Sequence, residues 1–273
     1  MAFPVVGVIA PELAISHLTE QARRLGVIIK ASTAAMNAEQ LQEFAKDCNL
    51  ICIEPNLVPI GAIKVVEQSG VLIYPSSKLL TAISTIQLNS AENEKFVITA
   101  ARSAHAQSAI WPIVLASKDL LISPAPGVSE EQAVTIAVSV LNLLNELNLT
   151  GGIELILDGN NYQNLIAVNW LQPTSAFLTE INSTTNYFEQ YLRAVLDLPL
   201  GETTTQRSFA VIGSLTTDPN SDDYRPYLHL MARNPNLKFD QSVKVVGVAG
   251  DNLETLLTEV IHAQQYYSGE IDS

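Results

Sequence analysis

The sequence predicts an α/β protein in three parts. Through residues 1–85, short β-rich runs alternate with helical patterns, which is typical of a parallel sheet with helices on its faces. Residues 86–201 combine runs typical of an antiparallel sheet with one long amphipathic helix, and residues 202–273 form a small β-rich module that ends in a helix. We therefore expect three domains with boundaries near residues 85 and 201.

The first part contains four short strands and the helices between them. The first helical pattern opens at Pro11-Glu12 and stops at Gly26, a residue type that commonly closes a helix because it tolerates positive φ. A further helix follows Tyr74-Pro75-Ser76 and runs to about residue 85. The expected strands are 5–9, 27–30, 50–53 and 71–73, and the other expected helices are 38–46 and 60–68.

The first strand-to-helix turn argues against a phosphate site. Parallel βα turns bind phosphate through free glycine N–H groups at the start of the helix. Here the turn is Ala10-Pro11-Glu12, in which proline has no N–H and the glutamate would repel an anion. We expect no phosphate binding at this turn.

The second part contains three strands and then a long helix, Ser129 to Leu147. Ser129 is a suitable N-cap, and Glu131 places negative charge in the first turn. Apolar residues recur at helical spacing, which predicts a stripe facing the core. The expected strands are 96–101, 109–115 and 120–123, and the stripe comprises residues 133, 136, 137, 140, 141, 144 and 147.

A hairpin and a helix follow, and the third part closes the chain. The turn 158–161, Asp-Gly-Asn-Asn, favours a hairpin between strands 153–157 and 165–170. A long polar loop then leads to a helix from about 185 to 196. The β-rich module contains the runs 209–213, 227–231 and 243–248, and a final helix covers residues 251 to about 267.

Composition limits the possible functions. The 273-residue chain is 47% hydrophobic but only 16% charged, well below the roughly 25% of ordinary soluble domains. Its net charge of −13 and the lack of a basic cluster argue against nucleic acid and anionic membranes as partners. The low charge density fits a protein that buries surface in an oligomer.

Cysteine and histidine add no metal or redox site. Cys48 and Cys52 have no nearby histidine, so we expect two buried, reduced thiols. The four histidines are dispersed without metal-binding spacing. We expect no secretory leader and no membrane span, and a cytoplasmic location.

Two runs carry specific motifs, residues 188–201, FEQYLRAVLDLPLG, and residues 124–132, PAPGVSEEQ. They resemble motifs of the 5-(carboxyamino)imidazole ribonucleotide synthase (PurK) family of the ATP-grasp superfamily. Weaker matches carry the resemblance along the rest of the chain. They are residues 7–13, 22–26, 49–59, 75–76, 96–103, 111–112, 153–155, 168–169 and 228–230.

The resemblance also shows where this chain departs from the family pattern. Trp170 stands where the family has a metal-binding glutamate, and residues 173–181 lack the chemistry of the family loop. Asp240 stands where an arginine would hold the substrate phosphate. The family's separate lid, with its ATP-binding lysine and glycine loop, is missing between residues 84 and 96. We therefore identify the chain as a degenerate member without the lid.

The resemblance implies an ATP- and Mg²⁺-dependent carboxylate-amine ligase of purine biosynthesis. Because of the departures, we expect no ATP cofactor here and a pseudoenzyme that acts as a binding, regulatory or assembly protein. The alternative is residual synthase activity, or another small-ligand enzyme that uses the cleft. Possible partners are a second copy in a homodimer, a complete PurK-type synthase or another protein. The predicted remnant cleft comprises Glu54, Arg102, Glu154, Asn169, Trp170, Arg193 and Arg233, with Glu154 the one remaining metal ligand.

Overall fold

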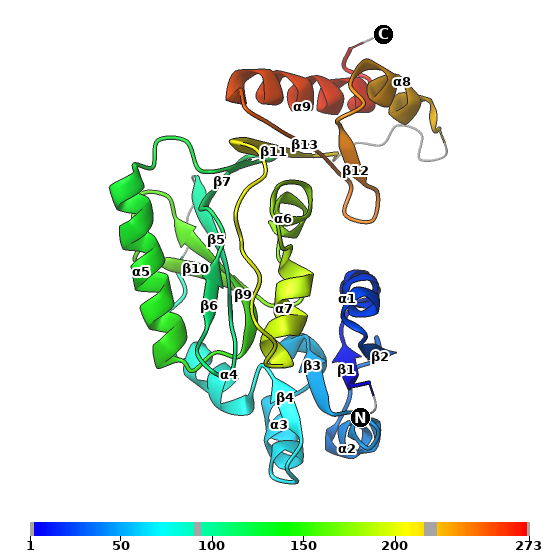
Figure 1. Ribbon diagram of the computed structural model, residues 1–273, viewed down its shortest axis with the longest axis vertical. Coiled ribbons are helices and arrows are strands. Elements are labelled where there is room, and N and C mark those ends of the chain that lie inside the picture. Colours follow the sequence, from blue (N-terminus) through cyan, green and yellow to red (C-terminus); the bar gives the residue numbers. More distant parts are fainter. Residues whose placement is uncertain (1–2, 90–93, 216–222, 272–273) are drawn as a thin grey trace.

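The computed structural model describes residues 3–89, 94–215 and 223–271, which form the two sheets shown in Figure 1. A small parallel sheet has the strand order β2-β1-β3-β4. A nine-stranded sheet has the order β10-β9-β5-β7-β8-β11-β13-β12, with β6 paired to β5 beside this path. The predicted α/β class, with a parallel N-terminal sheet followed by an antiparallel one, is confirmed.

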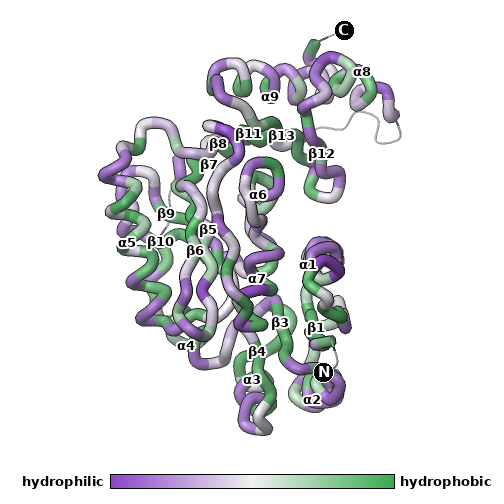
Figure 2. The backbone as a smooth tube through the Cα atoms, in the orientation of Figure 1, coloured by the Kyte–Doolittle hydropathy of each residue, from purple (hydrophilic) through white to green (hydrophobic). Residues whose placement is uncertain are grey.

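The small sheet is built from the alternating strands and helices that the sequence predicts. Helix α1 ends at Gly26, whose φ of 67° is left-handed and whose N–H donates to the Ala22 carbonyl. In Figure 2 the hydrophobic colour follows the central strands β1 and β3. The elements are β1 (Val5–Ile9), α1 (Glu12–Leu25), β2 (Ile28–Ser32), α2 (Ala38–Ala45), β3 (Leu50–Ile53), η1 (Pro55–Leu57), α3 (Ile60–Glu67), β4 (Leu72–Tyr74) and α4 (Ser77–Ser84).

The large sheet continues from the middle of the chain into its C-terminal part. The expected boundary at residue 201 therefore falls between strands of one sheet, and the three-domain division stays a prediction. The expected strand 109–115 is in fact two strands, since Trp111-Pro112 interrupts it and proline has no N–H to pair. The strands are β5 (Lys95–Arg102), β6 (Ser108–Ile110), β7 (Val114–Ser117), β8 (Leu120–Ser123), β9 (Gly151–Asp158), β10 (Leu165–Asn169), β11 (Phe209–Ser214), β12 (Lys238–Asp240) and β13 (Val245–Gly250).

Helices cover both faces of the large sheet (Figure 1). On one face lies α5 (Glu130–Glu146), whose Ser129 and Gln132 form a capping box and whose Ile136, Val140 and Leu144 are buried. On the other face lie α6 (Ala176–Asn182) and α7 (Tyr187–Val195). The sequence predicted α7 but took α6 for polar loop, because its polar ends obscure a single apolar turn.

The two sheets are joined through α1 and α7. Ala14 and Leu18 of α1 share a buried cluster with Phe188 and Leu192 of α7. At the other end of the large sheet, α8 (Arg225–Arg233) and α9 (Leu253–Ser268) pack together, and α9 packs on β11 and β13. The run 227–231, expected within a β-rich module, lies in helix α8, where an apolar stripe at helical spacing buries Tyr227 and Leu230.

Candidate functional site

The β9–β10 hairpin sets Glu154 opposite Asn169. The two residues pair across the antiparallel ladder, so their side chains lie on the same face of the sheet. The Asn169 Nδ2 group donates to Glu154 Oε1 at 2.7 Å. The structure thus brings together the two residues of the predicted cleft that share this hairpin.

The Glu154 carboxylate is fully buried and accepts five hydrogen bonds from the protein. Its side chain is 0% exposed. Besides Asn169, the donors are the backbone N–H and the hydroxyl of both Thr174 and Ser175. Thr174 donates to Oε1 at 2.9 and 3.1 Å, and Ser175 donates to Oε2 at 2.9 and 2.5 Å.

These donors lie in the segment just before α6. Ser175 precedes the helix, and instead of capping it, the Ser175 hydroxyl contacts Glu154 and lies 2.6 Å from the Thr99 hydroxyl on β5. Thr99 pairs with Glu154 in the ladder, so its side chain lies on the same face of the sheet and supports the Ser175 hydroxyl. A carboxylate has about four lone-pair sites, so no acceptor position of Glu154 is left for another ligand.

Trp170 follows β10 and is 6% exposed, within the large hydrophobic cluster that also contains Leu157 and Leu165. Its carbonyl accepts a hydrogen bond from the buried Tyr187 hydroxyl. Trp170 therefore packs in the core and does not line the cavity described below.

Glu54 lies just beyond β3 and contacts the same loop from the small sheet. The Leu171 N–H donates to Glu54 Oε2 at 3.3 Å. Partial burial raises the Glu54 pKa above its ordinary value, and the Leu171 bond opposes this effect. Glu54 thus links the small sheet to the loop that follows Trp170.

The three arginines of the predicted cleft lie elsewhere. Buried Arg102 donates to Asn145 Oδ1 at 2.9 Å and to the Leu149 carbonyl at 2.6 Å, which ties β5 to the end of α5. Arg193 pairs with Glu189 one turn away and donates to the Pro199 carbonyl. Arg233 is exposed on α8. These positions give Arg102 and Arg193 structural roles.

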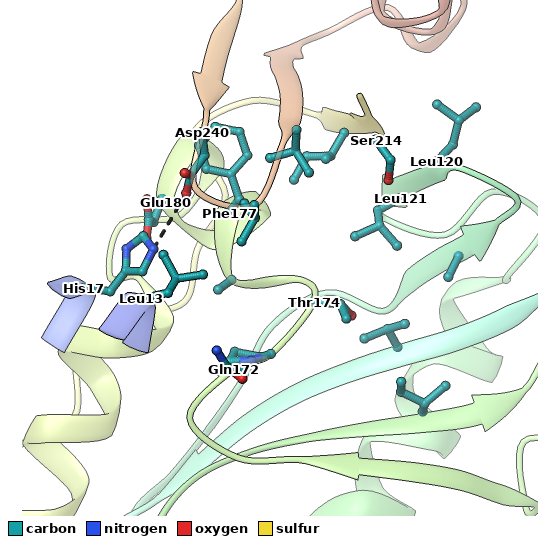
Figure 3. Close-up of a pocket in the computed structure, with 18 of the residues that line it drawn as sticks. Leu13, His17, Leu120, Leu121, Gln172, Thr174, Phe177, Glu180, Ser214 and Asp240 are labelled. Atoms are coloured by element: carbon teal, nitrogen blue, oxygen red, sulfur yellow. Dashed lines mark ion pairs between the residues drawn. The ribbon is translucent and has the colours of Figure 1, made fainter. Parts of the chain in front are cut away.

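A cavity of about 460 Å³ lies beside residues 171–175, which we call the Glu154 loop because it binds that carboxylate. The cavity is bounded by α1, the face of the large sheet, α6 and the β12–β13 hairpin (Figure 3). His17 of α1 stands at one end. Its Nδ1 is 3.2 Å from Glu180 Oε1 on α6, and its Nε2 is 3.7 Å from Asp240 Oδ2 on β12. The sequence missed this cluster because the three residues carry no spacing signal.

The surroundings of His17 favour its charged form. The hydrogen bond to Glu180 is the main cause of a raised His17 pKa. Burial opposes this effect, and the charges of Glu180, Asp240 and Glu20 add to it. The imidazole also stacks on Phe188, with ring centroids 4.7 Å apart. His17 thus connects α1, α6 and β12 around the cavity.

The Glu154 carboxylate is saturated by five protein donors, so in this arrangement it has no free oxygen for a Mg²⁺ ion. Within residues 3–89, 94–215 and 223–271, no group of three or more His, Cys, Asp or Glu side chains has metal-binding geometry. A magnesium site usually needs carboxylate oxygens that face the ion.

Two general expectations can be compared with the structure. Cys52 is buried, and burial raises its pKa to about 12, whereas Cys48 is only half-buried; both are free thiols. Among the described residues, no helix combines the length and the apolar character that crossing a membrane requires.

Comparison with known proteins finds relatives over part of the chain. No family model matches it. It is 33% identical over 151 residues to N5-carboxyaminoimidazole ribonucleotide synthase of Mycobacterium tuberculosis, and 32% identical over 132 residues to that of Corynebacterium ammoniagenes. The first match covers 50% of this chain and 34% of that protein, and the second covers 43% and 31%. The match thus spans about a third of these relatives' length.

Solved structures of the same synthases share the fold. The enzyme from Thermotoga maritima superposes with a TM-score of 0.78 at 16% identity, covering 97% of this chain and 98% of that chain. The Aspergillus clavatus synthase in complex with ADP and 5-aminoimidazole ribonucleotide gives 0.77 at 14% identity, covering 96% and 98%. The chain is thus similar in sequence to these synthases over about half of its own length and shares the fold of their solved structures, which supports the resemblance found in the sequence.

Proposed function

We propose that this homologue of the N5-carboxyaminoimidazole ribonucleotide synthases does not bind Mg²⁺-ATP and acts as a non-catalytic binding, regulatory or assembly protein linked to purine biosynthesis. One observation carries the proposal. The carboxylate at the family's metal position is buried and accepts five hydrogen bonds from Asn169, Thr174 and Ser175. Displacing these donors for a metal would leave buried polar groups unpaired, at a cost of roughly 1–3 kcal/mol each.

Two further features support the proposal. The chain passes from α4 to β5 through residues 85–94, a connection too short to contain a folded lid. Trp170, at the second metal-ligand position implied by the resemblance, is packed in the core. Phosphoryl chemistry depends on positioned cations that neutralise the phosphates, and Arg102 and Arg193 instead bind carbonyls and side chains of the protein.

The nucleotide part of the proposal is tested by a thermal-shift titration with Mg²⁺-ATP. A ligand that binds the folded state must raise its stability. We expect no shift at millimolar nucleotide, whereas a complete synthase measured in parallel shifts upward. A saturable rise in Tm with Mg²⁺-ATP, absent with Mg²⁺ alone, would contradict the proposal.

The alternative function is residual synthase activity. The cavity beside the Glu154 loop supports this alternative, because it leaves space for a small ligand. The alternative predicts ATP hydrolysis that depends on 5-aminoimidazole ribonucleotide, the ligand bound in the related Aspergillus structure. Turnover above a Glu54→Gln control would support this alternative, since Glu54 is the half-buried carboxylate retained from the small sheet.

The expected partners and location also belong to this proposal. We place the protein in the cytoplasm, because we expect the related synthases to act there. A complete synthase of the same cell is the first candidate partner. Affinity capture of that synthase by the tagged protein, and its loss when the untagged protein competes, would support an assembly or regulatory role.

A further inference from the structure

The cavity between α1 and the large sheet has the size of a small-molecule site. Its volume of about 460 Å³ lies within the roughly 300–1,000 Å³ of typical ligand pockets. Its walls come from α1, the face of the large sheet, the loop before α6, α6 itself and the β12–β13 hairpin. A ligand here would contact both α1, which belongs to the N-terminal part, and the large sheet.

Apolar side chains form most of the wall. Figure 3 shows Leu13 near His17 at one end and Leu120 and Leu121 at the other, with Phe177 between them. Strands β5, β7 and β9 add the floor. The apolar lining residues include Leu13, Val97, Ala116, Leu120, Leu121, Ile156, Phe177, Ile212 and Val245.

Most charged side chains around this wall are already paired or solvated. His17 contacts both Glu180 and Asp240, so the half-buried carboxylates share a cation of the protein. Lys118 and Asp119 are exposed at the β7–β8 turn and carry opposite charges. Lys95 is half-buried and has no ion-pair partner among the described residues, but the lining also includes the carboxylates of Asp119, Glu180 and Asp240, which makes it a weak site for an anion.

Uncharged polar groups remain available at the wall. The Ser214 side chain is half-buried and points its hydroxyl from β11 beside Leu121 (Figure 3). Gln172 lies at the rim of the loop before α6. Neither side chain has a hydrogen-bond partner within the described parts of the chain. A ligand hydroxyl or carbonyl would satisfy such groups without bringing charge into the cavity.

We propose that this cavity binds an uncharged, mainly apolar small molecule that carries one hydroxyl or carbonyl group. A cationic ligand would meet carboxylates that His17 already contacts, and an anionic ligand would meet Lys95 in a lining that also includes carboxylates, so a charged ligand would lose its hydration for little gain. The inference goes beyond the proposed function and does not depend on it, because such a ligand carries no phosphate and needs no metal.

The test compares three probes of equal size, phenylpropanol, phenylpropionate and phenylpropylamine, by calorimetry or ligand-observed NMR in the absence of Mg²⁺. We expect phenylpropanol to bind at least about tenfold more tightly than either charged probe. Ala116→Trp, which fills the floor of the cavity, should weaken phenylpropanol at least about tenfold. Ala35→Trp on an exposed loop is the matched control and should leave binding unchanged.

Each other result overturns the proposal. Preference for phenylpropionate would assign the site to Lys95, and preference for phenylpropylamine would assign it to Glu180 and Asp240. No saturable binding of any probe, or equal binding to the Ala116→Trp variant, would mean that the cavity is not a ligand site. Thermal unfolding of both tryptophan variants shows whether each is folded, and if Ala116→Trp is unfolded, Leu121→Phe takes its place. The Mg²⁺-ATP titration is read separately, so failure of one proposal does not decide the other.

Discussion

Ser175 donates both its backbone N–H and its hydroxyl to the same oxygen of Glu154, at 2.9 and 2.5 Å. The two residues lie 21 positions apart, on the loop before α6 and on strand β9. This contact makes Glu154, which the resemblance predicts at a metal-ligand position, a structural anchor for the loop. Removing the anchor should therefore affect the stability of the fold.

Glu154→Gln should destabilise the protein by about 2–3 kcal/mol. The amide replaces one acceptor oxygen with an NH₂ group, so buried donors of Thr174 or Ser175 face another donor. Chemical denaturation near neutral pH measures the change. Glu146→Gln, an exposed change on α5, is the matched control and should stay within about 0.5 kcal/mol of the parent. Equal stabilities of the two variants would show that the five hydrogen bonds do not hold the loop.

Trp170→Glu should lower the free energy of unfolding by about 3–5 kcal/mol, because it removes a buried ring and buries a charge without a partner. Trp170→Phe should cost less, since an aromatic ring stays in the cluster. Neither variant should gain Mg²⁺-ATP affinity. If Trp170→Glu restored nucleotide binding in a thermal-shift titration, the donors around Glu154 would have to be displaceable.

The contacts of His17 predict a pH-dependent contribution to stability. Its folded-state pKa is raised above the ordinary 6.5, mainly by the hydrogen bond to Glu180, so the stabilisation is fully present below 6.5 and is lost as pH rises through the folded-state value. His17→Gln should therefore lose most stability near about pH 5.5 and least near about pH 8.5. His229→Gln, on α8, is the control. If the difference in stability between His17→Gln and the parent did not change with pH, the charged imidazole would not stabilise the fold.

Glu54→Gln should stabilise the protein at neutral pH. Burial raises the folded-state Glu54 pKa above 4.5, so ionisation costs stability above the folded-state value, and this cost disappears below 4.5. The glutamine carbonyl can still accept from the Leu171 N–H. Urea denaturation at neutral and acid pH should show that the variant has the higher free energy of unfolding near neutrality and the same value as the parent below pH 4.5. A less stable variant at neutral pH would mean that the carboxylate has a favourable partner.

We also propose that the protein is a homodimer, since only 16% of its residues are charged. Val134 and Val138, one turn apart on α5, are 57% and 51% exposed, and a partner that covered them would remove this apolar surface from water. Light scattering at micromolar concentrations should give the mass of two chains. Val138→Glu should shift the mass towards one chain, whereas Thr135→Glu on the same helix tests whether any added charge has this effect. A monomer in the parent would refute the proposal.

Much of the fold was predictable because its signals are local. Gly26 closes α1 in the left-handed conformation that glycine adopts most easily, and Ser129 caps α5 as its hydroxyl predicts. Alternating strands and helices predicted the parallel sheet. Two helices were misread or missed, α8 at 227–231 and the short helix α6, since runs of five to seven residues hold too few repeats to separate the two periods.

The site was predictable only in part. The hairpin turn and the alternation of strand residues bring Glu154 and Asn169 together, and the motif FEQYLRAV carries the resemblance to the synthases. What the sequence by itself determined was therefore this resemblance, most of the elements and the pair across the hairpin, because each depends on neighbours along the chain. Only the tertiary structure decided that Thr174 and Ser175 saturate Glu154, that Arg102 and Arg193 face the protein, and that His17 meets Glu180 and Asp240. Apart from those of Arg193, these contacts join segments far apart in the chain, and hydrogen bonds depend on distance and angle that residue type alone does not specify.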